Sequence, residues 1–135
     1  MSKETAILAR RWFEEVWNNR RTEAIEELMA SDAIGHMEGG DANGPSEFQR
    51  IRELFLVALP DMHITVEDVL AEGDRAAVRW RVDATHAGDL MGIAPTNRAV
   101  QVRGTSWLTV RDGKLAEGWD TWNLGGLLES LRSTQ

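Results

Sequence analysis

The hydrophobic period of this chain changes once, near Pro60, and this change limits the folds that it can adopt. Before Pro60, apolar residues recur at helical spacing, and after it they alternate with polar residues as in half-buried strands. Helices followed by a run of strands are typical of an α+β domain in which a sheet packs against helices. We therefore expect a meander of antiparallel strands that wraps around the N-terminal helices.

Three helices are expected before Pro60. Residues 4–18 carry apolar residues at helical spacing, Thr22 opens a second short helix, and Pro45 suits the first turn of a third. The glycine-rich residues 33–44 predict a long loop, which is either functional or mobile. The apolar stripe of the third helix predicts its buried face: Phe48, Ile51, Leu54, Phe55 and Ala58.

Four strands and a short closing helix are expected after Pro60, with a hairpin turn at Asp112-Gly113 before the last strand. In the second strand, the even positions from Ala76 to His86 share one face, and Trp80 is among them. In the third strand, Ser106 shares a face with Val102 and Leu108. The alternation predicts that both faces point into the interior.

The length and composition exclude several classes of protein. A chain of 135 residues without linker or repeat predicts a single domain over residues 1–135. The net charge of −7 argues against a nucleic-acid partner, which would select basic patches. No apolar run is long enough for a membrane span, and the N-terminus does not resemble a signal peptide, so a cytoplasmic location is expected. Zero cysteines and three histidines without paired ligand spacing predict no metal site.

The last strand contains the candidate catalytic residue, Asp120, which lies between Trp119 and Trp122. A carboxylate in apolar surroundings is disfavoured in its charged form, which raises its pKa toward the range useful for proton transfer. The small residues Ala116 and Gly118 share its strand face and would leave space for a ligand. Strand parity alone does not decide which face is inside. The structural alternative is that Asp120 caps the final helix or pairs with an arginine.

Four other polar residues have both a functional and a structural interpretation. His86 could exchange a proton with Asp120 or be a satisfied core histidine. Ser106 could donate to a substrate carbonyl or bond locally, and Asn123 could orient Asp120 or cap the closing helix. His36, in the glycine-rich segment, could contact a ligand at the mouth of a pocket or be an exposed loop residue.

The opposite face of the sheet is expected to be an interface. Tryptophan and arginine are favoured at protein interfaces, and four such residues share this face. They predict a homodimer through the sheet face: Arg79, Arg81, Arg103 and Trp107.

Several short motifs, in this order, together resemble the SnoaL-like polyketide cyclases of the nuclear-transport-factor-2-like superfamily. They are Gly44-Pro45, Leu59-Pro-Asp61, Glu72-Gly-Asp-Arg75, Thr85-His86, Met91-Gly-Ile-Ala-Pro-Thr96, Asp112-Gly-Lys114 and Glu117-Gly-Trp-Asp120. The resemblance implies a cone-shaped α+β fold of the cystatin-like type, with a strongly curved, mixed or antiparallel sheet wrapped around the N-terminal helices. It also implies a cavity inside the cone and commonly a dimer.

The resemblance places the acid/base of the family at Asp120, inside the cone. The chain departs from the family pattern at three positions: a partner histidine is replaced by Ser106, an acidic residue by Asn123, and the glycine of a Pro-Thr-Gly turn by Asn97. These departures concern the polyketide substrate more than the fold.

We therefore expect a cofactor-independent cyclase or isomerase of the polyketide (ester) cyclase type, acting on a small hydrophobic carbonyl compound. Asp120 would remove a proton α to the carbonyl, while His86 and Ser106 would hold the enolate oxygen. Trp80, Trp122, Met91 and Ile93 would line the pocket. The alternatives are a non-catalytic binding protein of the same fold and an epoxide hydrolase or dehydratase-type lyase.

Overall fold

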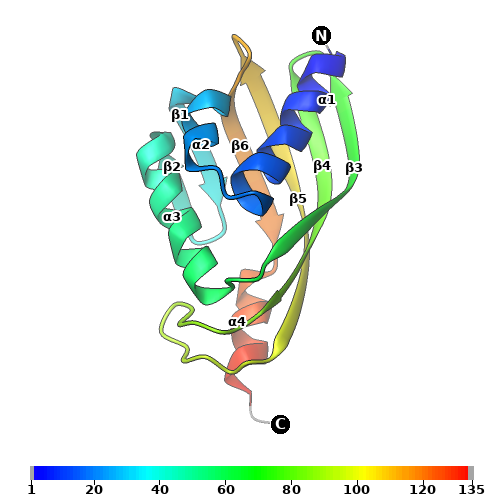
Figure 1. The fold of residues 1–135 in the computed structure, drawn as a ribbon. Coiled ribbons are helices and arrows are strands. Elements are labelled where there is room, and N and C mark those ends of the chain that lie inside the picture. Colours follow the sequence, from blue (N-terminus) through cyan, green and yellow to red (C-terminus); the bar gives the residue numbers. More distant parts are fainter. Residues whose placement is uncertain (1, 134–135) are drawn as a thin grey trace.

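The computed structural model describes residues 2–133, in which helices pack on one side of a six-stranded sheet (Figure 1). Within these residues, no helix has both the length and the apolar character needed to cross a membrane. The elements follow one another as α1 (Ser2–Arg11), the π-helix η1 (Trp12–Asn18), α2 (Thr22–Leu28), β1 (Met29–Met37), β2 (Gly40–Asn43), α3 (Gly44–Ala58), β3 (His63–Glu72), β4 (Arg75–Thr85), β5 (Ala99–Arg111), β6 (Lys114–Trp122) and α4 (Leu124–Arg132).

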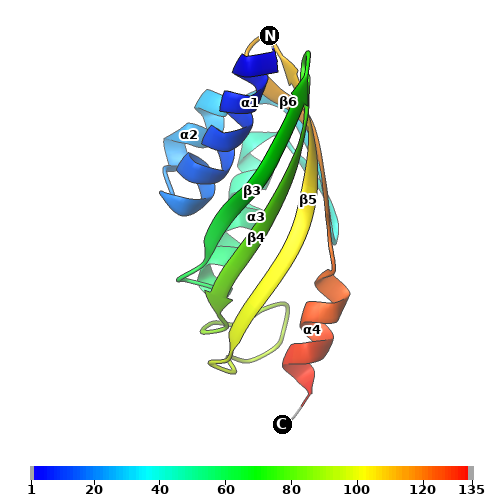
Figure 2. The same cartoon turned by 90° about the vertical axis from the view of Figure 1, so that its right-hand side faces the viewer.

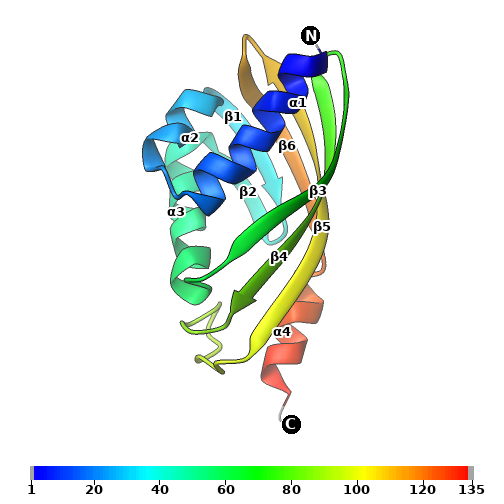
Figure 3. The ribbon, with the colours of Figure 1, turned by 45° about the vertical axis from the view of Figure 1, so that its right-hand side comes forward.

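The sheet has the strand order β2-β1-β6-β5-β4-β3. Strands β3 to β6 form the expected antiparallel meander, and β1 joins it parallel to β6, so the sheet is mixed. Helices α1, α2 and α3 lie against one face, whereas α4 lies beyond the end of β6 and beside the end of β5 that begins at Ala99 (Figure 2). The long strands curve around this helical layer (Figure 3). The expected α+β fold with a curved sheet around the N-terminal helices is confirmed.

The prediction of a long loop over residues 33–44 is wrong, because most of this segment belongs to a β-hairpin. Ile34 pairs with Asn43 and Met37 with Gly40. Gly39 and Gly40 have φ of 101° and 142°, which non-glycine residues rarely adopt, and they make the tight turn. The glycines that suggested a loop are therefore turn residues, and the strand alternation puts His36 and Met37 on opposite faces.

The first long helix has the expected extent but changes its form halfway. In η1 the backbone N–H of Asn19 donates to the carbonyl of Glu14 at 2.8 Å, five residues earlier, which widens the turn. The wider turn lets four large side chains of η1 point into the core: Trp12, Phe13, Val16 and Trp17. The apolar stripe predicted these residues but not the change of helix type.

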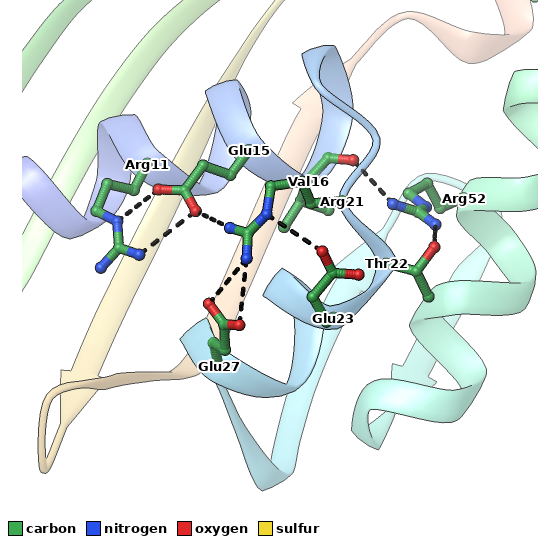
Figure 4. Close-up of polar contacts among 8 residues, drawn as sticks. All are labelled: Arg11, Glu15, Val16, Arg21, Thr22, Glu23, Glu27 and Arg52. Atoms are coloured by element: carbon green, nitrogen blue, oxygen red, sulfur yellow. Dashed lines mark hydrogen bonds and ion pairs between the residues drawn. The ribbon is translucent and has the colours of Figure 1, made fainter.

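A buried arginine joins α3 to the N-terminal helices (Figure 4). The Arg52 side chain, 1% exposed, donates from Nη1 to the Val16 carbonyl at 2.9 Å and from Nη2 to Thr22 Oγ1 at 2.8 Å. Leu54, expected in the buried stripe, is 65% exposed instead. The helix is rotated so that Phe48 and Arg52 face the core, because the free carbonyl at the end of η1 needs a donor.

Candidate active site

A cavity of about 80 Å³ lies between the inner face of the sheet and the helices. Asp120 is the one charged residue among those that line it, and Ser106 is the one hydroxyl residue. The other lining residues are apolar or aromatic: Trp12, Phe13, Trp17, Met37, Phe48, Phe55, Leu59, Met62, Ile64, Trp80, Val82, Val102, Trp122 and Leu127. An apolar cavity with a few convergent polar groups is the usual form of a small-molecule site.

Three side chains from neighbouring strands form a hydrogen-bonded chain in this cavity. Trp80 Nε1 on β4 donates to Ser106 Oγ on β5 at 2.9 Å, and Ser106 Oγ donates to Asp120 Oδ1 on β6 at 2.6 Å. The register explains why Ser106 and Asp120 meet, since they are direct partners across β5 and β6. Only Oδ1 of Asp120 receives the serine hydroxyl, so the second carboxyl oxygen is available to a ligand.

The cavity changes the proton affinity of Asp120. Burial away from water raises the pKa of its carboxyl above the usual 3.8, and repulsion from Glu38 raises it further. The hydrogen bond from Ser106 acts in the opposite direction, because it favours the charged form. The carboxyl group therefore accepts a proton more readily than an exposed aspartate would.

A wider cavity of about 330 Å³ lies beside the first and shares part of its lining. Met37, Phe55 and Trp122 line both cavities, so these three side chains stand between them. The wider cavity is formed by the β1–β2 turn, by α3 and by the loop that contains Asp89, Leu90 and Met91. We call it the mouth cavity.

The structure brings together four of the predicted site residues and separates the others. Trp80, Ser106, Trp122 and Asp120 line the same cavity. Met91 lies at the mouth cavity and is 53% exposed.

Two predicted pocket residues have structural contacts instead. Ile93 is not among the lining residues of either cavity and pairs through its backbone with Leu90. Asn123 caps α4, because its Oδ1 accepts from the N–H of Gly126 at 2.8 Å. The capping alternative thus describes its contact.

The structure does not place His86 in the cavity with Asp120, contrary to our expectation. β4 ends at Thr85, and the fully buried His86 is held by the following loop. Its Nδ1 lies 2.9 Å from Thr96 Oγ1 and accepts from the N–H of Thr96 at 3.3 Å. The strand alternation correctly predicted that the His86 side chain is buried, but it did not predict Thr96 as its hydrogen-bond partner.

The expected position of His36 at the pocket mouth is also wrong. Because residue 36 is part of β1, its side chain lies on the outer face of the sheet, opposite to that of Met37. It stacks on Trp119 with the ring centroids 5.3 Å apart, and its Nε2 lies 2.7 Å from Glu117 Oε2. Glu117 and then Asp41 raise the pKa of this histidine.

Much of the cavity wall was not predicted as a site. Trp12, Phe13, Trp17 and Phe48 come from the helices, and their spacing predicted only a buried face. No sequence signal separates an apolar residue that lines a cavity from one that fills the core. Within residues 2–133, no group of three or more side chains is arranged as metal ligands.

Comparison with known proteins identifies the family. The family model of the SnoaL-like polyketide cyclases matches residues 7–131. No curated protein matches the chain.

Three solved structures are similar over nearly the whole chain. AclR from Streptomyces galilaeus, a candidate hydroxylase, shares 30% identity with a TM-score of 0.86 and coverage of 100% of both chains. IdmH from Streptomyces antibioticus, a candidate polyketide cyclase, shares 28% identity with a TM-score of 0.83, covering 96% of this chain and 99% of IdmH. A candidate SnoaL-like polyketide cyclase from Jannaschia sp. CCS1 shares 19% identity with a TM-score of 0.92, covering 99% of this chain and 95% of that one. With the family model matching almost every described residue, the chain belongs to the SnoaL-like polyketide cyclase family.

Proposed function

We propose that the protein is a cofactor-independent cyclase or isomerase in which Asp120 transfers a proton on a small hydrophobic carbonyl compound. The observation that carries the proposal is the position of this carboxyl, which lies in an otherwise apolar cavity with one hydroxyl partner. Burial raises the pKa of this carboxyl, which makes the carboxylate a stronger base than an exposed aspartate. The family provides independent support, since its model describes polyketide cyclases.

The first step is removal of a proton from the carbon next to the carbonyl. The free carboxyl oxygen of Asp120 takes this proton, and the electron pair of the C–H bond moves toward the carbonyl oxygen to give an enolate. Protonation weakens Asp120 as an acceptor, so the Ser106 hydroxyl can donate to the enolate oxygen instead. The carboxylic acid then returns its proton, to oxygen after ring closure or to carbon in an isomerisation.

The size of the cavity limits what can enter it. About 80 Å³ holds several water molecules but not a molecule with several rings. A larger ligand would have to extend past Met37, Phe55 and Trp122 into the mouth cavity, with its reactive carbon in the inner cavity. We therefore propose an elongated or flat ligand with one end beside Asp120.

The arrangement favours proton transfer over the epoxide hydrolase alternative. An epoxide hydrolase of this fold would be expected to use an arginine and a second carboxylate in the cavity. Arg79, Arg81 and Arg103 do not line it, and Asp120 is the charged residue that does. A binding protein without catalysis is the alternative that the following experiment separates.

The test is the exchange of the α-protons of tetralone, a bicyclic ketone, with deuterated water. We expect the wild-type protein to accelerate this exchange, and Asp120→Asn to lose about 10²–10⁴-fold of the acceleration, the usual contribution of a positioned base. Asp83→Asn, which removes a carboxylate from outside the cavity, is the matched control and should keep the wild-type rate. Equal exchange rates for the wild type and Asp120→Asn would contradict the proposal and would favour a binding protein without catalysis.

A further inference from the structure

The Trp80 indole has a polar contact that a simple pocket wall would not need. Trp80 is 6% exposed and lines the cavity, and its Nε1 lies 2.9 Å from Ser106 Oγ. An indole N–H can only donate, so the serine oxygen must accept. The serine hydrogen is then directed to its other neighbour, Asp120 Oδ1, at 2.6 Å. The tryptophan thereby sets the donor direction of both hydrogen bonds, from Trp80 to Ser106 and from Ser106 to Asp120.

We propose that Trp80 is a positioning residue that acts through Ser106 on the Asp120 carboxylate, and that Gly104 provides the space for it. This inference rests on the proposed function of Asp120 as the proton-transfer group. Trp80 itself transfers no proton, since its role is to hold the Ser106 hydroxyl on the carboxylate.

The register of the strands shows why a glycine is needed at residue 104. Trp80 pairs with Gly104, whereas Ser106 lies two residues further along β5, opposite Val78. To reach Ser106, the indole has to lie across the backbone of β5 at Gly104. A Cβ atom there would be 2.5 Å from two carbons of the indole, Cζ2 and Cη2, and 2.8 Å from the Thr121 carbonyl oxygen. Any side chain at this position would displace the ring from Ser106.

The contact has a consequence for the chemistry of the carboxyl group. A hydroxyl that accepts a hydrogen bond becomes a stronger donor, and its rotation is restricted. Donation to the ionised carboxylate opposes the effect of burial, because it lowers the pKa that burial raises. Through Ser106, Trp80 therefore favours the ionised form of Asp120, the form that a general base needs before it can accept a proton.

The experiment is a carboxyl carbon NMR titration of Asp120 in four variants. Trp80→Phe should raise the titration midpoint by roughly half to one pH unit, the size expected for the loss of one hydrogen bond between neutral groups. Ser106→Ala should raise it at least as much, and the double variant should match Ser106→Ala alone. Trp107→Phe is the control, since Trp107 is 47% exposed and does not line the cavity; its midpoint should equal that of the wild type.

The double variant distinguishes positioning from a general loss of packing. A tryptophan that only fills space would give a shift that adds to that of Ser106→Ala. Additive shifts, or an unchanged midpoint in Trp80→Phe, would overturn the inference. A wild-type midpoint at the ordinary value would instead count against the proposed function, so the two failures are distinguishable.

A second measurement does not depend on the folding of Trp80→Phe. In the otherwise unchanged protein, the indole N–H resonance of Trp80 should follow the titration of Asp120 through Ser106. In Ser106→Ala this dependence should disappear. The link from Trp80 through Ser106 to Asp120 would be contradicted by an indole resonance that does not follow the Asp120 titration in the wild type. A resonance that still follows it in Ser106→Ala would contradict the link as well.

Discussion

At the scale of single residues, the ionised Asp120 carboxylate destabilises the folded protein, and it is also the proposed proton-transfer group. Its pKa is raised in the folded protein, mainly by burial. Between the unfolded and folded pKa values, the folded state therefore binds more protons than the unfolded state. The free energy of unfolding should fall as the pH rises through this range, because an ionised carboxylate is then held in an apolar cavity.

We therefore expect Asp120→Asn to melt at a higher temperature than the wild type at pH 8, with the difference vanishing below about pH 4, where unfolded aspartate is protonated. Thermal unfolding followed by circular dichroism across this pH range measures the effect. Asp83→Asn should show the opposite sign, since Gln101 and Arg81 lower the pKa of Asp83. A melting temperature of Asp120→Asn below that of the wild type at pH 8 would contradict the account.

The positions of some site residues, but not of all, could be predicted from the sequence. The alternation in the last two strands placed Ser106 inside, and the family resemblance placed Asp120 there too. The tryptophans around Asp120 were less informative, because Trp122 lines the cavity whereas Trp119 is 39% exposed on the other face. The partner of His86 could not be predicted, since it comes from a loop whose path depends on tertiary contacts.

At the scale of elements, the N-terminal helices depend on a buried cation as well as on apolar packing. The carbonyl of Val16 lies near the end of η1, where no further helical turn supplies a donor, and Arg52 provides one. Periodicity predicted where these helices lie but assigned Leu54 to the core. A hydrophobic pattern cannot predict a buried arginine that donates to a neighbouring helix end and pairs with Glu53.

Replacement of Arg52 by methionine should lower the free energy of unfolding by about 1–3 kcal/mol, since it leaves a buried carbonyl without a donor. Urea denaturation measures this change. Arg50→Met on the same helix is the control, because residue 50 is exposed and its replacement should cost less than about 0.5 kcal/mol. If both variants lose the same stability, Arg52 does not support the helix end.

At the scale of the whole molecule, the outer face of the sheet, opposite to α1, α2 and α3, carries a row of residues that crosses all six strands. Strand register aligns Leu70, Ala77, Trp107, Trp119, His36 and Asp41. Leu70 is 70% and Trp107 47% exposed, and Arg75 lies over the Trp107 ring. Arg79 and Arg81 lie near the β4 end of the row and pair with Glu67 and Asp83 of the same chain. The exposed leucine and tryptophan of the row are what favour an interface. We propose a homodimer through this face, which includes Arg79, Arg81 and Arg103.

The dimer proposal predicts that Trp107→Glu converts a dimer to a monomer. A charge in the centre of an apolar interface costs several kcal/mol, more than a moderate interface can lose. Sedimentation velocity at micromolar concentration distinguishes the two states. Val57→Glu, at a 65% exposed position on α3, should remain dimeric. A wild-type protein that sediments as a monomer would contradict the proposal.

The proposed mechanism depends on a cavity that holds the Asp120 carboxyl with a raised affinity for protons. The most direct measurement is a carboxyl carbon NMR titration of the protein labelled at aspartate, with the Asp120 signal assigned by its absence in Asp120→Asn. We expect the Asp120 midpoint to lie above the ordinary value of 3.8 and above those of Asp61 and Asp83, which lie outside the cavity and whose pKa values are lowered. An Asp120 midpoint at or below 3.8 would contradict the account.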